Sequence, residues 1–332
     1  MPEKEIVVIT GAGAGVGRAI ADEFANNGAD LALISRDEER LNAAGRYVRE
    51  RGGRTLTLPC DVSDANALEN AADRVEKELG PIDIWINCAM ATIFAPVVDI
   101  TPEEFRRATE VTYLGFVWGT MAALRRMKPR DRGTIVQIGS ALAYRSIPLQ
   151  SAYCGAKHAI AGFTDSVRCE LLHDNSRVHI TMVHLPGVNT PQFSWCRTKL
   201  PRHPAPLGTV YEPEMPAQAV YWAAHHRRRE VFVAGSTVEA IYGQDVLPGV
   251  ADRFLARNGY DGQQTNEPVA PDRPDNLFRP VPGPFGARGI FSDRAKAFSV
   301  QNWANLHRGI TAAMSAIALA GISLAWRKAR TH

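Results

Sequence analysis

The chain has 332 residues, of which 45% are hydrophobic and 22% charged, and its formal net charge is +3. This composition indicates a globular protein with a core large enough to enclose a ligand, and it excludes disordered, collagen-like and disulfide-stapled chains. The 38 basic and 35 acidic residues are interspersed, without the basic stripe that a nucleic-acid surface needs, so we expect no nucleic-acid partner.

Short β-rich segments alternate with helical patterns along most of the chain, which predicts an α/β fold. We expect a Rossmann-like, doubly wound, parallel sheet of about seven strands with helices on both faces, because the strands are almost continuously apolar. The predicted strands are Glu5–Thr10, Asp30–Ser35, Arg54–Cys60, Ile82–Asn87, Thr134–Ser140, Val178–Leu185 and Glu230–Ala234. Helix N-caps are expected at Asp37, Ser63 and Thr101, and helix exits at Gly28, Gly52 and Gly80.

A glycine-rich turn directly follows the first predicted strand. It consists of Thr10, Gly11, Ala12, Gly13, Ala14, Gly15, Val16 and Gly17 and leads into a helix expected to begin near Arg18. Glycines allow the backbone to approach a pyrophosphate at a helix N-terminus, where free N–H groups favour anions. The strict G-x-G-x-x-G spacing is not met, so a tight strand-to-helix turn without a ligand is the alternative interpretation.

The end of the second strand indicates which dinucleotide would bind. NAD-specific folds carry an acidic residue there, whereas this chain has Ser35 and Arg36. Because a guanidinium can pair with a 2′-phosphate, we predict NADP(H) as the preferred cofactor, with NAD(H) as the second candidate. The alternative is that Arg36 only begins a solvated charged turn.

Ser140 ends the fifth predicted strand, and Tyr153 and Lys157 follow it. Four residues separate the tyrosine and the lysine, so a helix places both on one face. Positive charge favours a phenolate, so Lys157 and an oxidised nicotinamide would lower the pKa of Tyr153 and let it exchange a proton with a substrate oxygen. Ser140 would hold the same oxygen. By itself the tyrosine–lysine pair is also typical of an aromatic ring packed against an exposed lysine.

Taken together, these motifs resemble the short-chain dehydrogenase/reductase family, of the T-G-x-x-x-G-x-G and Y-x-x-x-K type, over roughly residues 5–240. The resemblance implies that Asp61 and Val62 flank an adenine and that Asn87 and Ala89 form the turn after the fourth strand. It also implies that Pro186, Gly187, Val188 and Thr190 hold the nicotinamide carboxamide. Related enzymes often pair through the tyrosine-bearing helix and the one before it, so a homodimer or homotetramer is expected.

Two positions depart from that family pattern. Thr112 stands where the family usually has an asparagine associated with a water-linked proton relay, although a threonine hydroxyl can also bind water. Met90 replaces a glycine beside the expected nicotinamide ribose. The departures leave a second hypothesis, a protein that binds NADP(H) as a sensor or scaffold with little turnover.

The substrate wall is expected to be mainly apolar, which favours a lipophilic alcohol, ketone or aldehyde. The predicted lining residues are Ala141, Leu142, Tyr144, Ile147, Pro148, Leu149, Val188, Phe193 and Trp195. Ordinary core packing is the alternative for each of them. The function predicted from the sequence is therefore an NADP(H)-dependent oxidoreductase that interconverts an alcohol and a carbonyl compound.

The chain divides into a catalytic domain over residues 1–262, a proline-rich linker or surface strap over 263–291 and a helical tail over 292–332, with a helix expected at Ser292–Arg308. The segment Ile310–Trp326 is uncharged and 17 residues long, within the ~17–25 that span a bilayer. Its small residues equally suit a helix docked on protein.

Cysteine usage and the N-terminus complete the prediction. The first residues, MPEKEIVVIT, leave no room for the apolar region of a signal peptide, so a cytoplasmic catalytic domain is expected, with or without a membrane anchor in the tail. No C-x-x-C pair is present, so we expect free thiols and no metal site. The cysteines are Cys60, Cys88, Cys154, Cys169 and Cys196.

Overall fold

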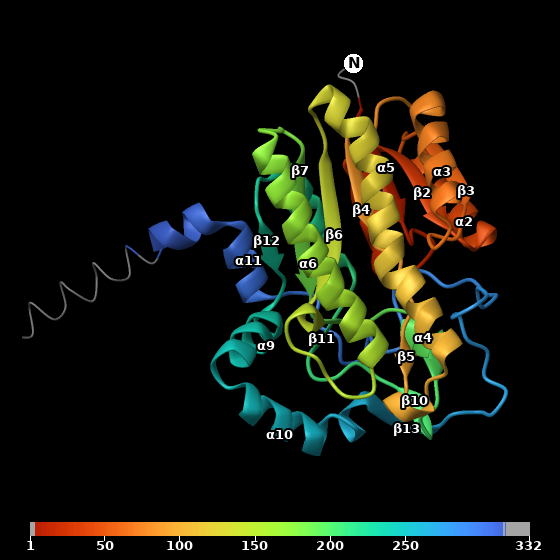
Figure 1. The fold of residues 1–332 in the computed structure, drawn as a ribbon, viewed down its shortest axis with the longest axis vertical. Helices are drawn as coiled ribbons and strands as arrows, with labels where there is room; N and C mark the ends of the chain where they lie inside the picture. Colours follow the sequence, from red (N-terminus) through yellow and green to blue (C-terminus); the bar gives the residue numbers. More distant parts are fainter. Residues whose placement is uncertain (1–3, 315, 317–332) are drawn as a thin grey trace, which may run out of the picture.

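The computed structural model of the chain describes residues 4–314 and 316. Seven parallel strands form its central sheet: β1 (Ile6–Thr10), β2 (Asp30–Ser35), β3 (Thr55–Pro59), β4 (Ile84–Asn87), β6 (Thr134–Ser140), β7 (His179–Leu185) and β12 (Glu230–Phe232). Their order across the sheet is β12-β7-β6-β4-β1-β2-β3 (Figure 1). The predicted fold class is confirmed, and the predicted strand ends differ from these by at most two residues.

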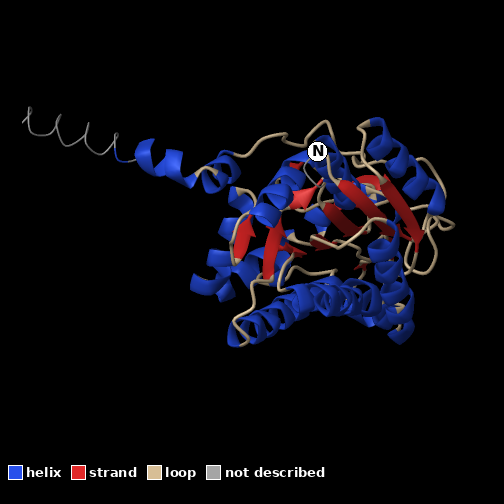
Figure 2. Cartoon of the chain, turned by 90° about the horizontal axis from the view of Figure 1, so that it is seen from above, coloured by secondary structure: helices blue, strands red, loops and turns tan. Residues whose placement is uncertain are grey.

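Helices cover both faces of the sheet, as seen from above in Figure 2. One layer contains α1 (Gly15–Asn26), α2 (Glu38–Glu50) and α8 (Glu214–His225), and the other contains α3 (Ala65–Glu78), α5 (Gly115–Arg130) and α6 (Ser151–His173). Figure 1 shows α5 and α6 in front of the sheet. Val7 and Ile9 of β1 pack into the first layer, and Ile6 and Val8 pack into the second. Both faces of β1 are therefore buried, which explains its continuous apolar sequence.

The predicted helix ends are mostly confirmed. Asp37 caps α2, and Thr101 forms a capping box with Glu104. Gly28, Gly52 and Gly80 adopt positive φ angles after their helices. The predicted cap at Ser63 is wrong, because the Asp64 side chain accepts hydrogen bonds from the N–H groups of Asn66 and Ala67. The first helix begins at Gly15 rather than near Arg18, since the residues from Gly11 to Ala14 suffice for the turn.

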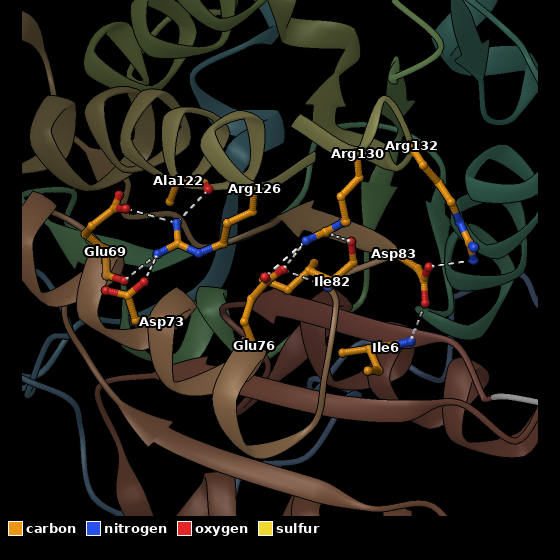
Figure 3. A network of polar contacts seen from close by, with 10 residues as sticks. All are labelled: Ile6, Glu69, Asp73, Glu76, Ile82, Asp83, Ala122, Arg126, Arg130 and Arg132. Carbon is orange, nitrogen blue, oxygen red and sulfur yellow. Dashed lines mark hydrogen bonds and ion pairs between the residues drawn. The ribbon is translucent and has the colours of Figure 1, made fainter. Parts of the chain in front are cut away.

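Arginines at the end of α5 and just beyond it bind acidic groups near the amino ends of the strands (Figure 3). The contacts join Arg126 to Glu69 and Asp73, Arg130 to Glu76 and the Ile82 carbonyl, and Arg132 to Asp83, which in turn accepts a hydrogen bond from the Ile6 N–H. This network fixes α5 on α3 at the edge of the sheet opposite the carboxyl ends of the strands.

Shorter elements surround the carboxyl ends of the sheet. Three pairs of short strands are β5 (Ile93–Phe94) with β9 (Arg197–Thr198), β8 (Gly187–Val188) with β11 (Val210–Tyr211), and β10 (Arg202–Pro204) with β13 (Gln264–Pro268). The remaining α-helices are α4 (Pro102–Thr109), α7 (Gln192–Trp195), α9 (Gly235–Val246), α10 (Pro248–Asn258) and α11 (Val300–Leu306). The structure also contains three 3₁₀ turns, η1 (Val97–Asp99), η3 (Ala141–Ala143) and η4 (Asp261–Gln263), and one π-helical turn, η2 (Glu110–Leu114). Residues 308–314, beyond α11, are helical as well.

The helix expected at Ser292–Arg308 is wrong in its first half. Residues 292–299 are not helical, because Lys296 instead exchanges backbone hydrogen bonds with Val210 and Glu212 beside β11. Ser299 then caps α11. The predicted membrane span, 310–326, lies mostly outside the described residues. Within residues 4–314 and 316, no helix combines the length and the apolar character that crossing a bilayer requires.

Two glycine-to-alanine variants test the packing of the first turn. A Cβ on Gly17 would lie 2.2 Å from the Gly11 carbonyl oxygen, whereas a Cβ on the exposed Gly243 of α9 would meet nothing within 4 Å. We expect Gly17→Ala to lower the free energy of unfolding, and Gly243→Ala to raise it by about 0.5–1 kcal/mol. Urea titration of both variants measures the changes, and a Gly17→Ala variant as stable as the unaltered protein would contradict this packing.

Candidate functional site

Two adjoining cavities open at the carboxyl ends of the strands, where the strand order reverses between β1 and β4. Open α/β sheets place their ligands at such a switch point. The first, here called the glycine cleft, lies over the turn after β1 and has a volume of about 180 Å³. The second, here called the tyrosine cavity, has a volume of about 610 Å³. Val16, Cys88, Met90, Thr190 and Gln192 line both, so one ligand could extend from one to the other.

The glycine turn lies unusually close to the end of β4. Gly11 has a φ of 74°, and a Cβ there would lie 2.8 Å from the Cα of Ala89. The Thr10 hydroxyl accepts hydrogen bonds from the N–H groups of Cys88 (2.9 Å) and Ala89 (3.2 Å). Thr10 therefore joins β1 to β4 behind the cleft and does not line it.

Most of the predicted cofactor residues surround the glycine cleft. They are Gly11, Gly13, Ala14, Gly15, Val16, Gly17, Ser35, Arg36, Asp61, Val62, Ala89 and Thr190. Asn87 is an exception, because it is fully buried behind the cleft. Its amide donates to Gln137 (2.9 Å) and Thr120 (3.1 Å) and accepts from Trp85 (2.8 Å). Asn87 thus links strands and helix and does not face the cavities.

The end of β2 offers donors to a phosphate group. The Ser35 hydroxyl is buried and has no hydrogen-bond partner within the described part of the chain. A Cβ on Gly13 would lie 2.8 Å from that hydroxyl, so the glycine keeps the space in front of it free. Arg36 and Arg40 line the same end of the cleft. This combination of an unpartnered hydroxyl and two guanidinium groups fits a 2′-phosphate.

Two arginines near this end of the cleft were not predicted from the sequence. Arg40 lines the cleft, and Arg107 forms an ion pair with the lining residue Asp61. Burial alone would raise the pKa of Asp61, but the hydrogen bonds from Arg107 and Ser63 hold it below its usual value. Asp61 is therefore ionised at neutral pH and accepts hydrogen bonds at the edge of the cleft.

Ser140, Tyr153 and Lys157 converge on the tyrosine cavity from the end of β6 and the first turns of α6. The Lys157 ammonium donates to the Ile138 carbonyl (2.6 Å) and lies 5.5 Å from the centre of the Tyr153 ring. Burial lowers the pKa of Lys157 to about 8. Burial also raises the pKa of Tyr153, and a hydrogen bond with Ser140 opposes this effect. Without a bound cofactor, the tyrosine is therefore a neutral phenol.

The nicotinamide-side residues predicted from the sequence also surround the tyrosine cavity. Pro186, Gly187, Val188 and Thr190 follow β7 and line it. Thr112, by contrast, is fully buried in the π-helical turn between α4 and α5. Its hydroxyl donates to the Ala91 carbonyl (2.8 Å) and accepts from the Ala91 N–H (2.9 Å). Both roles of that hydroxyl are thus used in holding the loop after β4.

The predicted apolar wall is only partly confirmed. Ala141, Leu142, Ile147, Val188 and Phe193 line the tyrosine cavity, whereas Tyr144, Pro148, Leu149 and Trp195 do not. Leu149 packs in a separate core cluster, and Trp195 lines the glycine cleft. The cavity also contains Arg145, whose guanidinium binds Gln244 of α9 and Asp252 of α10. The lining therefore combines apolar surface with a charged group where these two helices close over it.

A buried polar chain behind Ser140 has no counterpart in the sequence motifs. His184 Nδ1 lies 3.1 Å from the Ser140 carbonyl oxygen, and its Nε2 lies 3.6 Å from the Glu230 carboxylate. The Tyr144 hydroxyl donates to the same carboxylate (2.7 Å), which explains why Tyr144 turns away from the cavity. Burial would raise the pKa of Glu230, but the contacts with His184 and Tyr144 lower it to about 2. Strands far apart in sequence bring these groups together, so residue spacing does not reveal them.

The same region of the chain is similar to known proteins. A family model described as short chain dehydrogenase matches residues 5–199, which include every predicted site residue. The uncharacterized oxidoreductase YxnA of Bacillus subtilis is 30% identical over 277 residues, 82% of this chain and 78% of that protein. A 3-ketodihydrosphingosine reductase of Bos taurus is 30% identical over 193 residues, 57% of this chain and 58% of that protein.

A solved structure is also similar. It is an alcohol dehydrogenase from the archaeon Thermococcus sibiricus complexed with 5-hydroxy-NADP, with a TM-score of 0.61 and 26% sequence identity. The match covers 69% of this chain and 96% of that chain.

Replacing Lys157 tests whether its charge is costly in the folded protein. Burial disfavours the ammonium, so Lys157→Met should raise the free energy of unfolding at pH 7 by about 1–2 kcal/mol. In the folded protein this lysine loses its proton near pH 8, whereas in the unfolded chain it keeps the proton up to its ordinary pKa of 10.5. The difference in the free energy of unfolding between the variant and the unaltered protein should therefore decrease as the pH rises from about 8 towards 10.5. Urea titrations across this pH range measure it.

Lys77→Met, at an exposed position of α3, is the matched control and should change little. A Lys157→Met variant that is less stable at pH 7 would show that the ammonium stabilises the fold and would contradict this account.

Proposed function

This chain belongs to the short-chain dehydrogenase family, and on that premise we propose that it uses NADP(H) to interconvert a lipophilic alcohol and its carbonyl compound, with Tyr153 as the proton donor and acceptor. The observation that carries the proposal is the convergence of Ser140, Tyr153 and Lys157 on one cavity that adjoins the glycine cleft. When bound, the nicotinamide supplies or accepts the hydride.

The chain's own residues would handle the proton. The buried phenol of Tyr153 is neutral, so it can donate a proton to a carbonyl oxygen as that oxygen gains negative charge. Ser140 can donate a hydrogen bond to the same oxygen, and the contact between His184 and the Ser140 carbonyl holds this serine in place. Lys157 places positive charge on the ring side of Tyr153, which stabilises the phenolate left after proton transfer.

The charge at the end of β2 supports NADP(H) over NAD(H). Ser35 and Arg36 stand where NAD-specific folds have a carboxylate, and the unpartnered Ser35 hydroxyl lies beside two arginines. The apolar part of the tyrosine cavity supports a lipophilic substrate. One relative is a 3-ketodihydrosphingosine reductase, which agrees with this substrate class without identifying the substrate.

The outer face of α6 supports the proposed homodimer or homotetramer. Gly155 and Gly162 lie two turns apart on this helix, and a Cβ at either would meet nothing within 4 Å. A helix face without side chains at these positions allows a second helix to approach closely. Light scattering of the purified protein would establish the number of copies.

Removing the proposed proton donor tests the reaction. Tyr153→Phe should lower kcat for NADPH-dependent reduction of lipophilic ketones and aldehydes by about 10²-fold or more, because general acid catalysis contributes factors of this size. NADPH binding should persist, since the ring remains. Tyr113→Phe is the matched control, because Tyr113 packs against Phe163 away from the cavity. If the protein binds NADPH but turns over none of the substrates, the sensor hypothesis gains support, and activity retained by Tyr153→Phe would refute the proposed proton donor.

A single carboxylate tests the cofactor preference. Ser35→Asp should repel a 2′-phosphate and accept a hydrogen bond from a ribose 2′-hydroxyl, so the ratio of the Kd values for NADPH and NADH should reverse. Ser35→Ala removes only the hydroxyl and should weaken NADPH binding modestly, by about 1 kcal/mol. Fluorescence titration gives both Kd values. If Ser35→Asp leaves their ratio unchanged, the proposed preference for NADP(H) is wrong.

A further inference from the structure

The proline-rich segment lies across the glycine cleft. We call residues 273–291 the C-terminal strap; Figure 1 shows it within the blue loop that runs past β5 and α4 without forming a helix or strand. Asn276 and Pro280 of the strap line the cleft itself. Leu277 is fully buried among residues of the second helix layer, so the strap is anchored and does not only touch the surface.

One wall of the cleft holds the strap through arginine side chains. Arg36 donates to the carbonyl oxygens of Asn276 (2.5 Å) and Leu277 (3.3 Å), and Arg40 donates to that of Val281 (3.0 Å). Arg107 donates to the Leu277 carbonyl as well. A guanidinium has five N–H groups, so Arg36 keeps donors for a phosphate while it holds the strap.

Trp195 of α7, whose ring centre lies 4.8 Å from the Arg40 guanidinium, holds the same strap. The Asn276 N–H donates to the Trp195 carbonyl (2.8 Å), and the ring of Phe285 packs edge-on against Trp195 at 4.5 Å. Asn276 therefore bridges Arg36 and Trp195 at this end of the cleft.

The strap also contacts the start of α1. The N–H group of Gly15, at the helix end where anions bind, donates to the Gly286 carbonyl (3.0 Å). A pyrophosphate at this helix end would take the place of that carbonyl, so the strap has to shift at Gly286 before it can close over a bound cofactor. Further along, a Cβ on Gly289 would lie 2.4 Å from the Thr190 carbonyl oxygen, so the strap approaches the loop after β7 as closely as glycine allows. The strap is thus seated along the whole cleft.

The volume of the cleft indicates that the seated strap restricts the entry of a ligand. About 180 Å³ remain under the strap, less than the ~300–1,000 Å³ of typical ligand pockets. A dinucleotide could not pass between Arg36 and Trp195 while Asn276 joins them. Proline at positions 274, 280, 282 and 284 restricts the backbone of a released strap, so less conformational entropy is lost when it closes again.

We propose that the C-terminal strap is part of the cofactor site: it closes over the adenosine half of a bound NADP(H), and the cofactor enters and leaves only when the strap lifts from Arg36 and Trp195. This inference rests on the proposed function, since it assigns the glycine cleft to NADP(H). It adds a binding element that lies outside residues 5–199, the part of the chain matched by the family model.

The test compares the rate constants at which variants of the strap release NADPH. Leu277→Ala removes the buried anchor, Phe285→Ala removes the contact with Trp195, and Phe278→Ala is the matched control, because Phe278 is 48% exposed. Protein loaded with NADPH is mixed rapidly with excess NADP⁺, and the loss of NADPH fluorescence gives the dissociation rate constant. Both strap variants should release NADPH about ten-fold faster, whereas Phe278→Ala should match the unaltered protein.

The remaining outcomes separate the two proposals. Equal dissociation rate constants in all four proteins would overturn the role of the strap and leave the proposed function standing. Faster association with unchanged dissociation would also overturn it, because the strap would then only compete with the cofactor. If the unaltered protein binds no NADPH, both proposals fail. Should Leu277→Ala not fold, Phe285→Ala still decides the question.

Discussion

The close approach of two backbone segments, at the ends of β1 and β4, determines the geometry of the site. Gly11 lies against Ala89, and Gly17 lies against Gly11, at distances that no side chain would permit. The Thr10 hydroxyl then joins the two strand ends through the N–H groups of Cys88 and Ala89. This turn places the start of α1 and the end of β2 around one cleft. The cleft in turn fixes where a dinucleotide can lie relative to Tyr153.

The tyrosine cavity illustrates a different constraint, because its polar groups are buried. Lys157 is held by the Ile138 carbonyl in surroundings that disfavour its charge. Behind Ser140, the Glu230 carboxylate accepts a hydrogen bond from Tyr144 and lies 3.6 Å from His184, which contacts the Ser140 carbonyl. Burial of ionisable groups destabilises the folded state, and it is typical of active sites, where pKa values are shifted for catalysis. The local arrangement therefore agrees with the proposed proton transfer at Tyr153.

Sequence reasoning succeeded where the signal is local. Apolar strands, the glycine turn and the four-residue spacing of Tyr153 and Lys157 depend on neighbours along the chain, so their positions could be predicted. It did not find contacts between distant partners. Arg36 was predicted to pair with a 2′-phosphate, and no local pattern indicated that it also binds carbonyl groups about 240 residues further along the chain. Thr112 and Asn87 were placed at the site by the resemblance, yet their side chains are used within the core. No pattern in the proline-rich segment indicated which wall it would cover.

The measurement that tests this account most directly is a crystal structure of the complex with NADPH. We expect the 2′-phosphate within hydrogen-bond distance of the Ser35 hydroxyl and the Arg36 guanidinium, the adenosine beneath residues 276–281, and the nicotinamide facing Tyr153. A 2′-phosphate that contacts neither Ser35 nor Arg36, or a nicotinamide outside the tyrosine cavity, would contradict it.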